Sequence, residues 1–133
     1  MKGFILGIEE LKKLNVLYVE DEEEVSCEVI HNLNFFVKNI ISCKNGQEGL
    51  DSYLTQKDSI DIVITDVLMP VLDGKKMVDE IRKINPTIPI VYTTAFNDSE
   101  FLEYTKTQDL VQSILKPIDL EELFKIILKL INK

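Results

Sequence analysis

Four apolar segments of this 133-residue chain each lead directly into side chains that can do chemistry. Segments 16–19, 62–65, 90–93 and 111–115 are followed in turn by Glu20 and Asp21, by Asp66, by Thr94, and by Lys116. If the fold brings these ends together, the carboxylates would bind a cation, whereas the amine and the hydroxyl would bind an anion. A carboxylate nucleophile beside Mg2+, an amine and a hydroxyl is a set of groups suited to phosphoryl transfer.

Short apolar runs alternate with segments of helical periodicity along most of the chain. The predicted strands are 16–19, 40–43, 60–65, 88–93 and 111–115. The residues at helical spacing between and after them are Val25, Val29, Ile30 and Leu33; Leu50, Tyr53 and Leu54; Met77, Val78, Ile81 and Ile84; Phe101, Leu102 and Thr105; and Leu120, Leu123, Phe124, Ile127, Leu128 and Ile131. This alternation predicts an α/β fold of the (βα)5 kind, a doubly wound five-stranded parallel sheet covered by helices on both faces.

Local signals set the ends of several predicted helices. Pro86 ends the helix that follows the third strand, because the residue before a proline avoids helical angles. Any of Asn97, Asp98 and Ser99 offers a cap for the next helix, and Asp119 offers one for the last.

Length and composition fit a single domain. With 45% hydrophobic residues, the chain can bury one core. Residues 8–14 have some helical character, so we expect a lead segment over 1–13 and the folded domain over 14–133. Cys27 and Cys43 are too few for a disulfide framework or a zinc site, which favours a reducing compartment.

Charge and hydropathy argue against two classes of partner. A formal net charge of -8 and the lack of a basic stripe argue against a nucleic-acid surface. Apolar runs are short and broken by charge, and the start of the chain lacks the apolar stretch of a signal peptide, so we expect neither export nor membrane insertion. The sequence therefore predicts a cytoplasmic location.

The polar strand ends are expected to meet in one crevice, because ligands of doubly wound sheets bind beyond the carboxyl ends of the strands. Three carboxylates about 5 Å apart would repel by about 3 kcal/mol per pair at an effective dielectric of about 20, a cost that a bound cation removes. Ligands that are all oxygens indicate a hard ion, and Mg2+ suits a site with few carboxylates. Lys116 and Thr94 would then neutralise and hydrogen-bond an anion in the same crevice.

These motifs, in this order, resemble the response-regulator receiver domains of two-component systems. The matching residues, over about 14–131, are Glu20 and Asp21; Asp66, Met69, Pro70, Asp73 and Gly74; Thr94 and Ala95; and Lys116 and Pro117. The resemblance implies a flavodoxin-like fold with strand order 2-1-3-4-5. It also implies a phosphoprotein of signal transduction, a switch that catalyses its own phosphorylation and dephosphorylation rather than a separate enzyme.

The resemblance assigns roles to single residues. It implies that Asp66 takes a phosphoryl group from a phosphohistidine of a sensor histidine kinase or a phosphotransfer protein. The Mg2+ ligands that it implies are Glu20, Asp21, Asp66 and the backbone carbonyl of Leu68. Thr94 and Lys116 would contact the phosphoryl oxygens, and the bond from Lys116 to Pro117 is a candidate for the cis form.

Some residues depart from the family pattern. Ser113 stands three residues before Lys116, where the family usually carries Tyr or Phe, so the large side chain that reports the movement of the threonine is missing. Glu20 replaces the commoner Asp and should preserve metal binding. Leu68 and Phe96 occupy positions that influence hydrolysis in the family. Because both are apolar, they cannot position an attacking water, which predicts a long-lived phosphoaspartate.

Other functions stay open at this point. A receiver-like module that works by docking alone is favoured by Ser113 and disfavoured by the intact acidic site. A Mg2+-dependent phosphatase would need a second acid two residues after Asp66, where Leu68 stands. A flavodoxin-like cofactor role lacks a phosphate-binding loop after the first strand. The output domain or target is not determined by the sequence, and its candidate contacts are Glu103, Tyr104, Lys106 and Gln112.

Overall fold

The structure is a computed structural model that describes residues 2–95 and 99–132, with side chains described from residue 7 onward. The strands are β1 (Asn15–Val19), β2 (Asn39–Cys43), β3 (Ile62–Asp66), β4 (Ile90–Thr94) and β5 (Val111–Leu115). The helices are α1 (Lys2–Leu11), α2 (Glu23–Leu33), α3 (Gly46–Gln56), α4 (Gly74–Ile84), α5 (Ser99–Thr107) and α6 (Leu120–Ile131).

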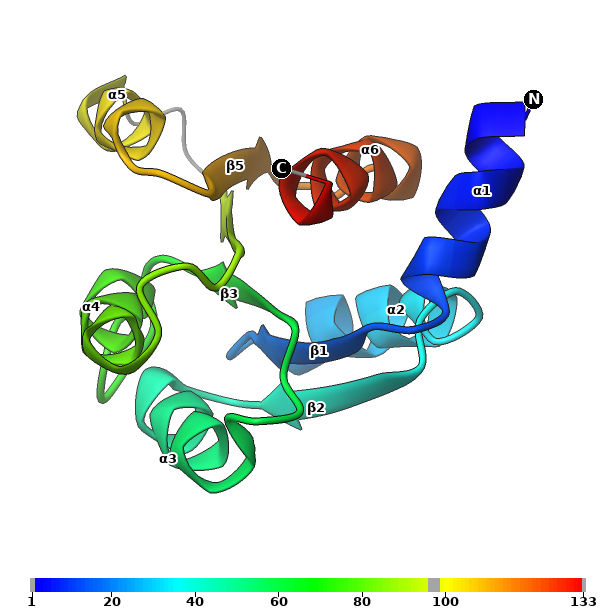
Figure 1. Ribbon diagram of the computed structural model, residues 1–133. Helices are drawn as coiled ribbons and strands as arrows, with labels where there is room; N and C mark the ends of the chain where they lie inside the picture. The colour runs from blue at the N-terminus through cyan, green and yellow to red at the C-terminus, as the bar shows by residue number, and fades with distance from the viewer. Residues whose placement is uncertain (1, 96–98, 133) are drawn as a thin grey trace.

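The strands form one parallel sheet in the order β2-β1-β3-β4-β5. Figure 1 shows α3, α4 and α5 on one side of this sheet and α2 and α6 on the other. The additional helix α1 lies beside α6, where Gly7 approaches Leu128 so closely that a Cβ would lie 2.6 Å from Leu128 Cδ1. The predicted (βα)5 doubly wound fold and its strand order are confirmed.

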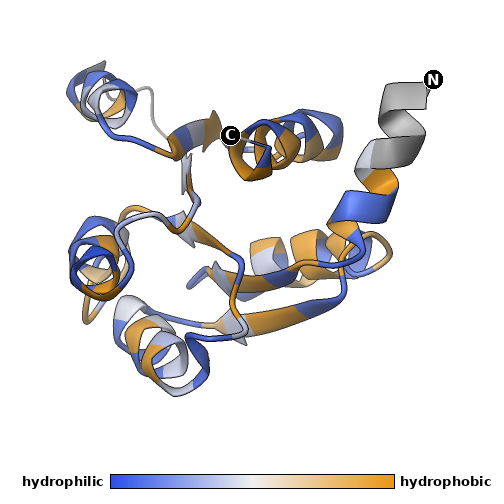
Figure 2. Cartoon of the chain, in the orientation of Figure 1, coloured by the Kyte–Doolittle hydropathy of each residue, from blue (hydrophilic) through white to orange (hydrophobic). Residues whose placement is uncertain are grey.

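Two apolar cores hold the layers together, one on each face of the sheet. Every residue of β3 and of β4 is buried, as expected for central strands that helices cover on both faces. Figure 2 shows the apolar stripes of the helices turned toward the sheet and the polar stripes turned outward. In the part of the chain that the structure describes, no helix is long and apolar enough to cross a membrane.

Side-chain caps fix where several helices begin. Asp119 accepts a hydrogen bond of 2.9 Å from the Glu121 N–H, which confirms it as the cap of α6. Asp73 caps α4 by accepting from the Lys76 N–H at 2.8 Å. Each cap of this kind contributes about 1 kcal/mol. The cap of α4 matters for function, because this helix begins directly after the loop that carries Asp66.

Several predicted boundaries were wrong. The lead helix is Lys2–Leu11 rather than 8–14, and buried Leu14 lies beyond its end. The strands predicted over 60–65 and 88–93 begin two residues later and extend to Asp66 and Thr94. Ile60 is excluded from β3 because its N–H bonds to the Gln56 carbonyl in the turn after α3.

Within the predicted helical stripes, three residues are corrected. Ile84 at the end of α4 is 41% exposed and Leu54 of α3 is 49% exposed, so neither packs against the sheet as predicted. Leu130, which the stripe of the last helix omitted, is buried. Helix α5 begins at Ser99, and the alternative caps Asn97 and Asp98 lie outside the described residues. Of its described residues only Thr105 is buried, so this helix packs less deeply than the others.

Candidate functional site

The carboxyl ends of β3, β4 and β5 and the start of α2 surround a hollow of about 100 Å3. Its lining residues are Glu22, Asp66, Leu68, Thr94, Ala95 and Lys116. The predicted meeting of the polar strand ends in one crevice is therefore confirmed for the third, fourth and fifth strands. The acids that follow β1 join the same crevice through their contacts with Asp66 and Lys116.

Lys116 lies between two buried carboxylates. Its ammonium donates a hydrogen bond of 2.8 Å to Asp66 Oδ2. Its Nζ also lies 2.6 Å from Glu20 Oε1, an ion-pair distance without hydrogen-bond geometry. The Glu20 side chain is fully buried and that of Asp66 is 10% exposed, so water does little to screen either contact. The amine thus neutralises the acidic crevice from the side of β5.

The electrostatic environment shifts the titration of this group of residues. Burial raises the pKa of the Glu20 carboxyl, and the charge of Asp66 raises it further, against the opposing effects of Lys116 and the Glu22 N–H. Burial on its own would lower the pKa of Lys116, but the hydrogen bond to Asp66 and the ion pair with Glu20 outweigh it and the pKa is raised. The ammonium is therefore held in its charged form.

The backbone around Asp66 is fixed from several directions. The Val67 N–H donates to Asp66 Oδ1 at 2.8 Å, and the Thr65 hydroxyl donates to the Asp66 carbonyl at 2.9 Å. Gly74 closes the loop, because its N–H donates to the Val67 carbonyl at 2.7 Å. A Cβ at Gly74 would lie 2.0 Å from the Asp66 carbonyl oxygen, so only glycine permits this approach.

Three carboxylates offer oxygens that a single cation could share. Ligand atoms of Glu20, Asp21 and Asp66 all lie within 4.8 Å of one another. Glu20 and Asp66 are buried, whereas Asp21 is exposed. A donor set made of carboxylate oxygens, without His or Cys, fits a hard ion such as Mg2+ that keeps several waters. The residues present therefore fit the expected metal.

Thr94 and Lys116 are brought together as predicted. Thr94 is 8% exposed and ends β4, and its carbonyl accepts a hydrogen bond of 2.7 Å from the Lys116 N–H. The peptide bond from Lys116 to Pro117 is cis, as the resemblance implied.

Leu68 lines the hollow with a side chain that is 67% exposed. Phe96, the other residue expected near the phosphoryl group, lies outside the described residues.

Two residues contribute to the crevice in ways that sequence reasoning missed. Glu22 was assigned no role from the sequence, yet its N–H donates to Glu20 Oε2 at 3.2 Å and the residue lines the hollow. Gly74 was named only as a residue that matches the family motif, but in the structure it is the close neighbour of the Asp66 carbonyl. Their nearness in sequence to acids of the site was the available signal.

The surface residues named as candidate contacts differ in exposure. Glu103 and Lys106 are exposed on α5 and form an ion pair of 3.3 Å. Tyr104 and Gln112 are half-buried, and so is Ser113.

The family described as the response regulator receiver domain matches residues 16–128. The chain is 35% identical over 115 residues to a probable C4-dicarboxylate response regulator of Bacillus subtilis, an alignment that covers 84% of this chain and 50% of that protein. It is 26% identical over 118 residues to the sensor kinase CckA of Brucella abortus, covering 89% of this chain and 12% of the kinase. The chain thus spans half or less of the length of these relatives.

Solved structures give the same result. A response regulator receiver domain protein from Clostridium thermocellum superposes with a TM-score of 0.82 at 26% identity, covering 90% of this chain and 94% of that one. The chemotaxis protein CheY4 of Vibrio cholerae superposes with a TM-score of 0.77 at 27% identity, covering 88% and 98%. A doubly wound sheet with an acidic crevice, in which a lysine contacts two of the carboxylates, is the arrangement of phosphoryl-accepting switches. The chain belongs to the response regulator receiver domain family, whose role in two-component systems is to accept a phosphoryl group.

Proposed function

We propose that Asp66 is the phosphoacceptor of this chain and that the surrounding residues catalyse its phosphorylation. A carboxylate oxygen of Asp66 attacks the phosphorus of a phosphohistidine and forms a P–O bond, while the P–N bond breaks and its electron pair returns to the leaving imidazole. Asp66 is the carboxylate that the fold places at the end of a central strand, on the wall of the hollow. The single observation that carries the proposal is the contact of Lys116 with both Asp66 and Glu20.

Mg2+ is the proposed cofactor, held by Glu20, Asp21, Asp66 and the Leu68 carbonyl. When bound, it would supply positive charge that offsets the carboxylates and the charge on the transferred group. Lys116 and Thr94 are proposed to hold the phosphoryl oxygens, the first through its ammonium and the second through its hydroxyl. Both face the hollow into which the group would enter.

The proposed output is a population shift between two arrangements of the crevice. Phosphorylation adds about -1.5 to -2 charges, which draws Lys116 and Thr94 toward the new group. A sensor histidine kinase or a phosphotransfer protein is the proposed donor, because the family includes receiver segments of sensor kinases such as CckA. The proposed location is the cytoplasm, because Cys27 and Cys43 are free thiols, which a reducing compartment favours.

The test is the intact mass of the protein after incubation with Mg2+ and acetyl phosphate. We expect wild type to gain one phosphoryl group, and Asp66→Asn or removal of Mg2+ to abolish the gain. Asp58→Asn, an exposed acid after α3, is the matched control and should label as wild type does. No labelling of wild type, together with no binding of Mg2+, would contradict the proposal and favour a module that acts by docking alone. Equal labelling of Asp66→Asn would contradict Asp66 as the acceptor and assign the phosphoryl group to another residue.

A further inference from the structure

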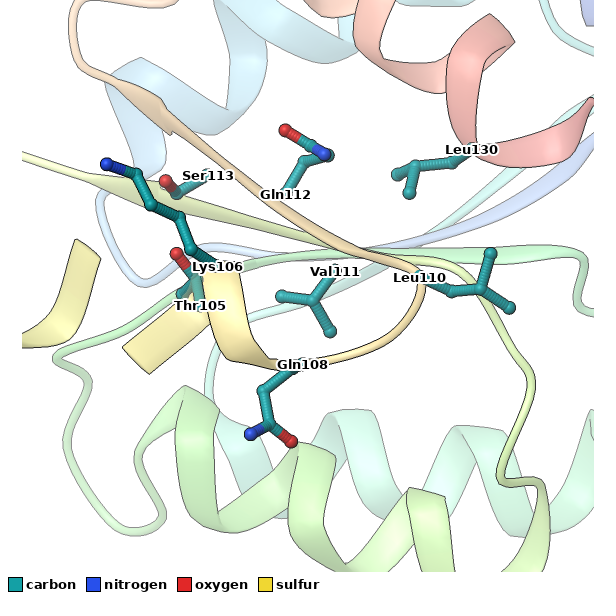
Figure 3. A pocket seen from close by; sticks show the side chains of 8 residues that line it. All are labelled: Thr105, Lys106, Gln108, Leu110, Val111, Gln112, Ser113 and Leu130. Carbon is teal, nitrogen blue, oxygen red and sulfur yellow. The ribbon is translucent and has the colours of Figure 1, made fainter. Parts of the chain in front are cut away.

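Position 113, where the family usually carries an aromatic residue, holds a small hydroxyl side chain near the edge of the sheet. Ser113 is half-buried and lines a hollow of about 370 Å3 between β5, α5 and the end of α6 (Figure 3). The other lining residues are Thr105, Lys106, Gln108, Leu110, Val111, Gln112 and Leu130, none of them aromatic. A ring at position 113 is therefore not available to report on the crevice.

Aromatic side chains instead connect the neighbouring strand to α5. The register of the sheet pairs Ser113 with Tyr92 of β4, which is 1% exposed. Tyr92 precedes Thr94 by two residues, so both side chains lie on the same face of the sheet. Its ring meets Phe101 of α5 edge to face, with centroids 5.0 Å apart and planes at 82°. The centroid of the Phe101 ring in turn lies 5.9 Å from the centroid of the Tyr104 ring. We call Tyr92, Phe101 and Tyr104 the aromatic series.

The far end of the aromatic series returns to the loop of the phosphoacceptor. Lys75 Nζ lies 4.9 Å from the centre of the Tyr104 ring, within the range of a cation–π interaction. Lys75 directly follows Gly74, which is hydrogen-bonded to Val67 and lies against the Asp66 carbonyl. Helix α5 is therefore connected to the crevice twice, once through β4 and once through the start of α4.

We propose that the aromatic series, rather than a side chain at position 113, transmits phosphorylation of Asp66 to α5. This inference rests on the proposed function and specifies how phosphorylation of that site changes the surface of α5. Edge-to-face rings attract through their quadrupoles only in specific orientations. A small displacement of the end of β4 at Thr94 also moves Tyr92, and therefore changes the position of the Phe101 ring against it. Phe101 and Tyr104 are three residues apart on one face of α5 and move with that helix as a unit. The exposed charges of α5 then present a different surface to an output partner.

The test follows hydrogen–deuterium exchange of α5 in the full chain, with and without BeF3- and Mg2+ as a phosphoryl mimic. Intact mass after acetyl phosphate reports separately on Asp66. Phe101→Leu keeps an apolar side chain and removes the ring, whereas Phe101→Tyr keeps the ring. Ser113→Ala is the matched control, and Tyr104→Leu replaces Phe101→Leu if a melting curve shows that the latter does not fold.

We expect exchange in α5 of wild type to change about tenfold with the mimic, and that of Phe101→Leu to change less than about twofold. Phe101→Tyr and Ser113→Ala should respond as wild type does, and all the variants should still take up one phosphoryl group. A full response in Phe101→Leu, a lost response in Ser113→Ala, or an unchanged α5 in phosphorylated wild type would overturn the inference. Failure of wild type to take up phosphoryl or to bind the mimic would instead overturn the proposed function.

Discussion

Lys116 donates a hydrogen bond of 2.8 Å to Asp66 across 50 residues of sequence. The same ammonium lies 2.6 Å from Glu20, so one cation compensates two buried carboxylates that the strand order places side by side. Removing one partner of a buried ion pair lowers the free energy of unfolding far more than removing one partner of a surface pair, because the remaining buried charge is left without water or a counter-ion. The stability of the crevice without metal therefore depends on Lys116.

Lys116→Met should destabilise the metal-free protein by about 3 kcal/mol, because Glu20 and Asp66 lose their shared counter-charge. Urea unfolding without Mg2+ measures this. Lys125→Met is the matched control, since Lys125 pairs with Glu121 at 3.5 Å on the exposed face of α6. That change should cost less than about 0.5 kcal/mol. Equal losses in the two variants would show that the crevice charges do not depend on Lys116.

Mg2+ should stabilise the folded protein, because the metal would bind the carboxylates only where the fold brings them together. At about 100 times its dissociation constant the gain is about 2.7 kcal/mol, and a chelator should reverse it. Asp21→Asn should remove most of the gain, whereas Glu23→Gln, an exposed acid in the first turn of α2, should leave it intact. Melting curves with Mg2+ and with chelator check this; an equal shift in Asp21→Asn would exclude Asp21 as a ligand.

The sequence predicts the fold and the strand ends well because both depend on local patterns. A buried apolar run that stops at Asp66, Thr94 or Lys116 is visible in the chain itself, and strand–helix alternation implies where those ends meet. The contact of Gly74 with the Asp66 carbonyl depends on how a loop folds back, which no local pattern encodes. The aromatic series was missed for the same reason, since its rings come from a strand and a helix.

Val71, in the loop after β3, has a φ of +71° and is 79% exposed. A left-handed backbone costs a residue with a Cβ about 1–2 kcal/mol, and no glycine or asparagine in this loop signals the left-handed position in the sequence. Val71→Gly should stabilise the protein by about 1 kcal/mol, after the loss of about 0.4–1 kcal/mol to the freer unfolded chain. Urea unfolding measures the change. Val71→Ala retains the Cβ and should stay within about 0.5 kcal/mol of wild type; an equal gain there would point away from backbone strain.

Leu68 should make the phosphoaspartate long-lived, because its exposed apolar side chain lines the hollow and cannot orient an attacking water. Leu68→Asn supplies an amide at the same place and should shorten the lifetime about tenfold by holding that water near the phosphorus. The decay of the phosphorylated mass after removal of acetyl phosphate, with Mg2+ present, measures it. Leu54→Asn, on the exposed face of α3, is the control for an added amide and should not alter the decay. A wild-type lifetime of seconds, or an unchanged decay in Leu68→Asn, would show that hydrolysis is governed elsewhere in the crevice.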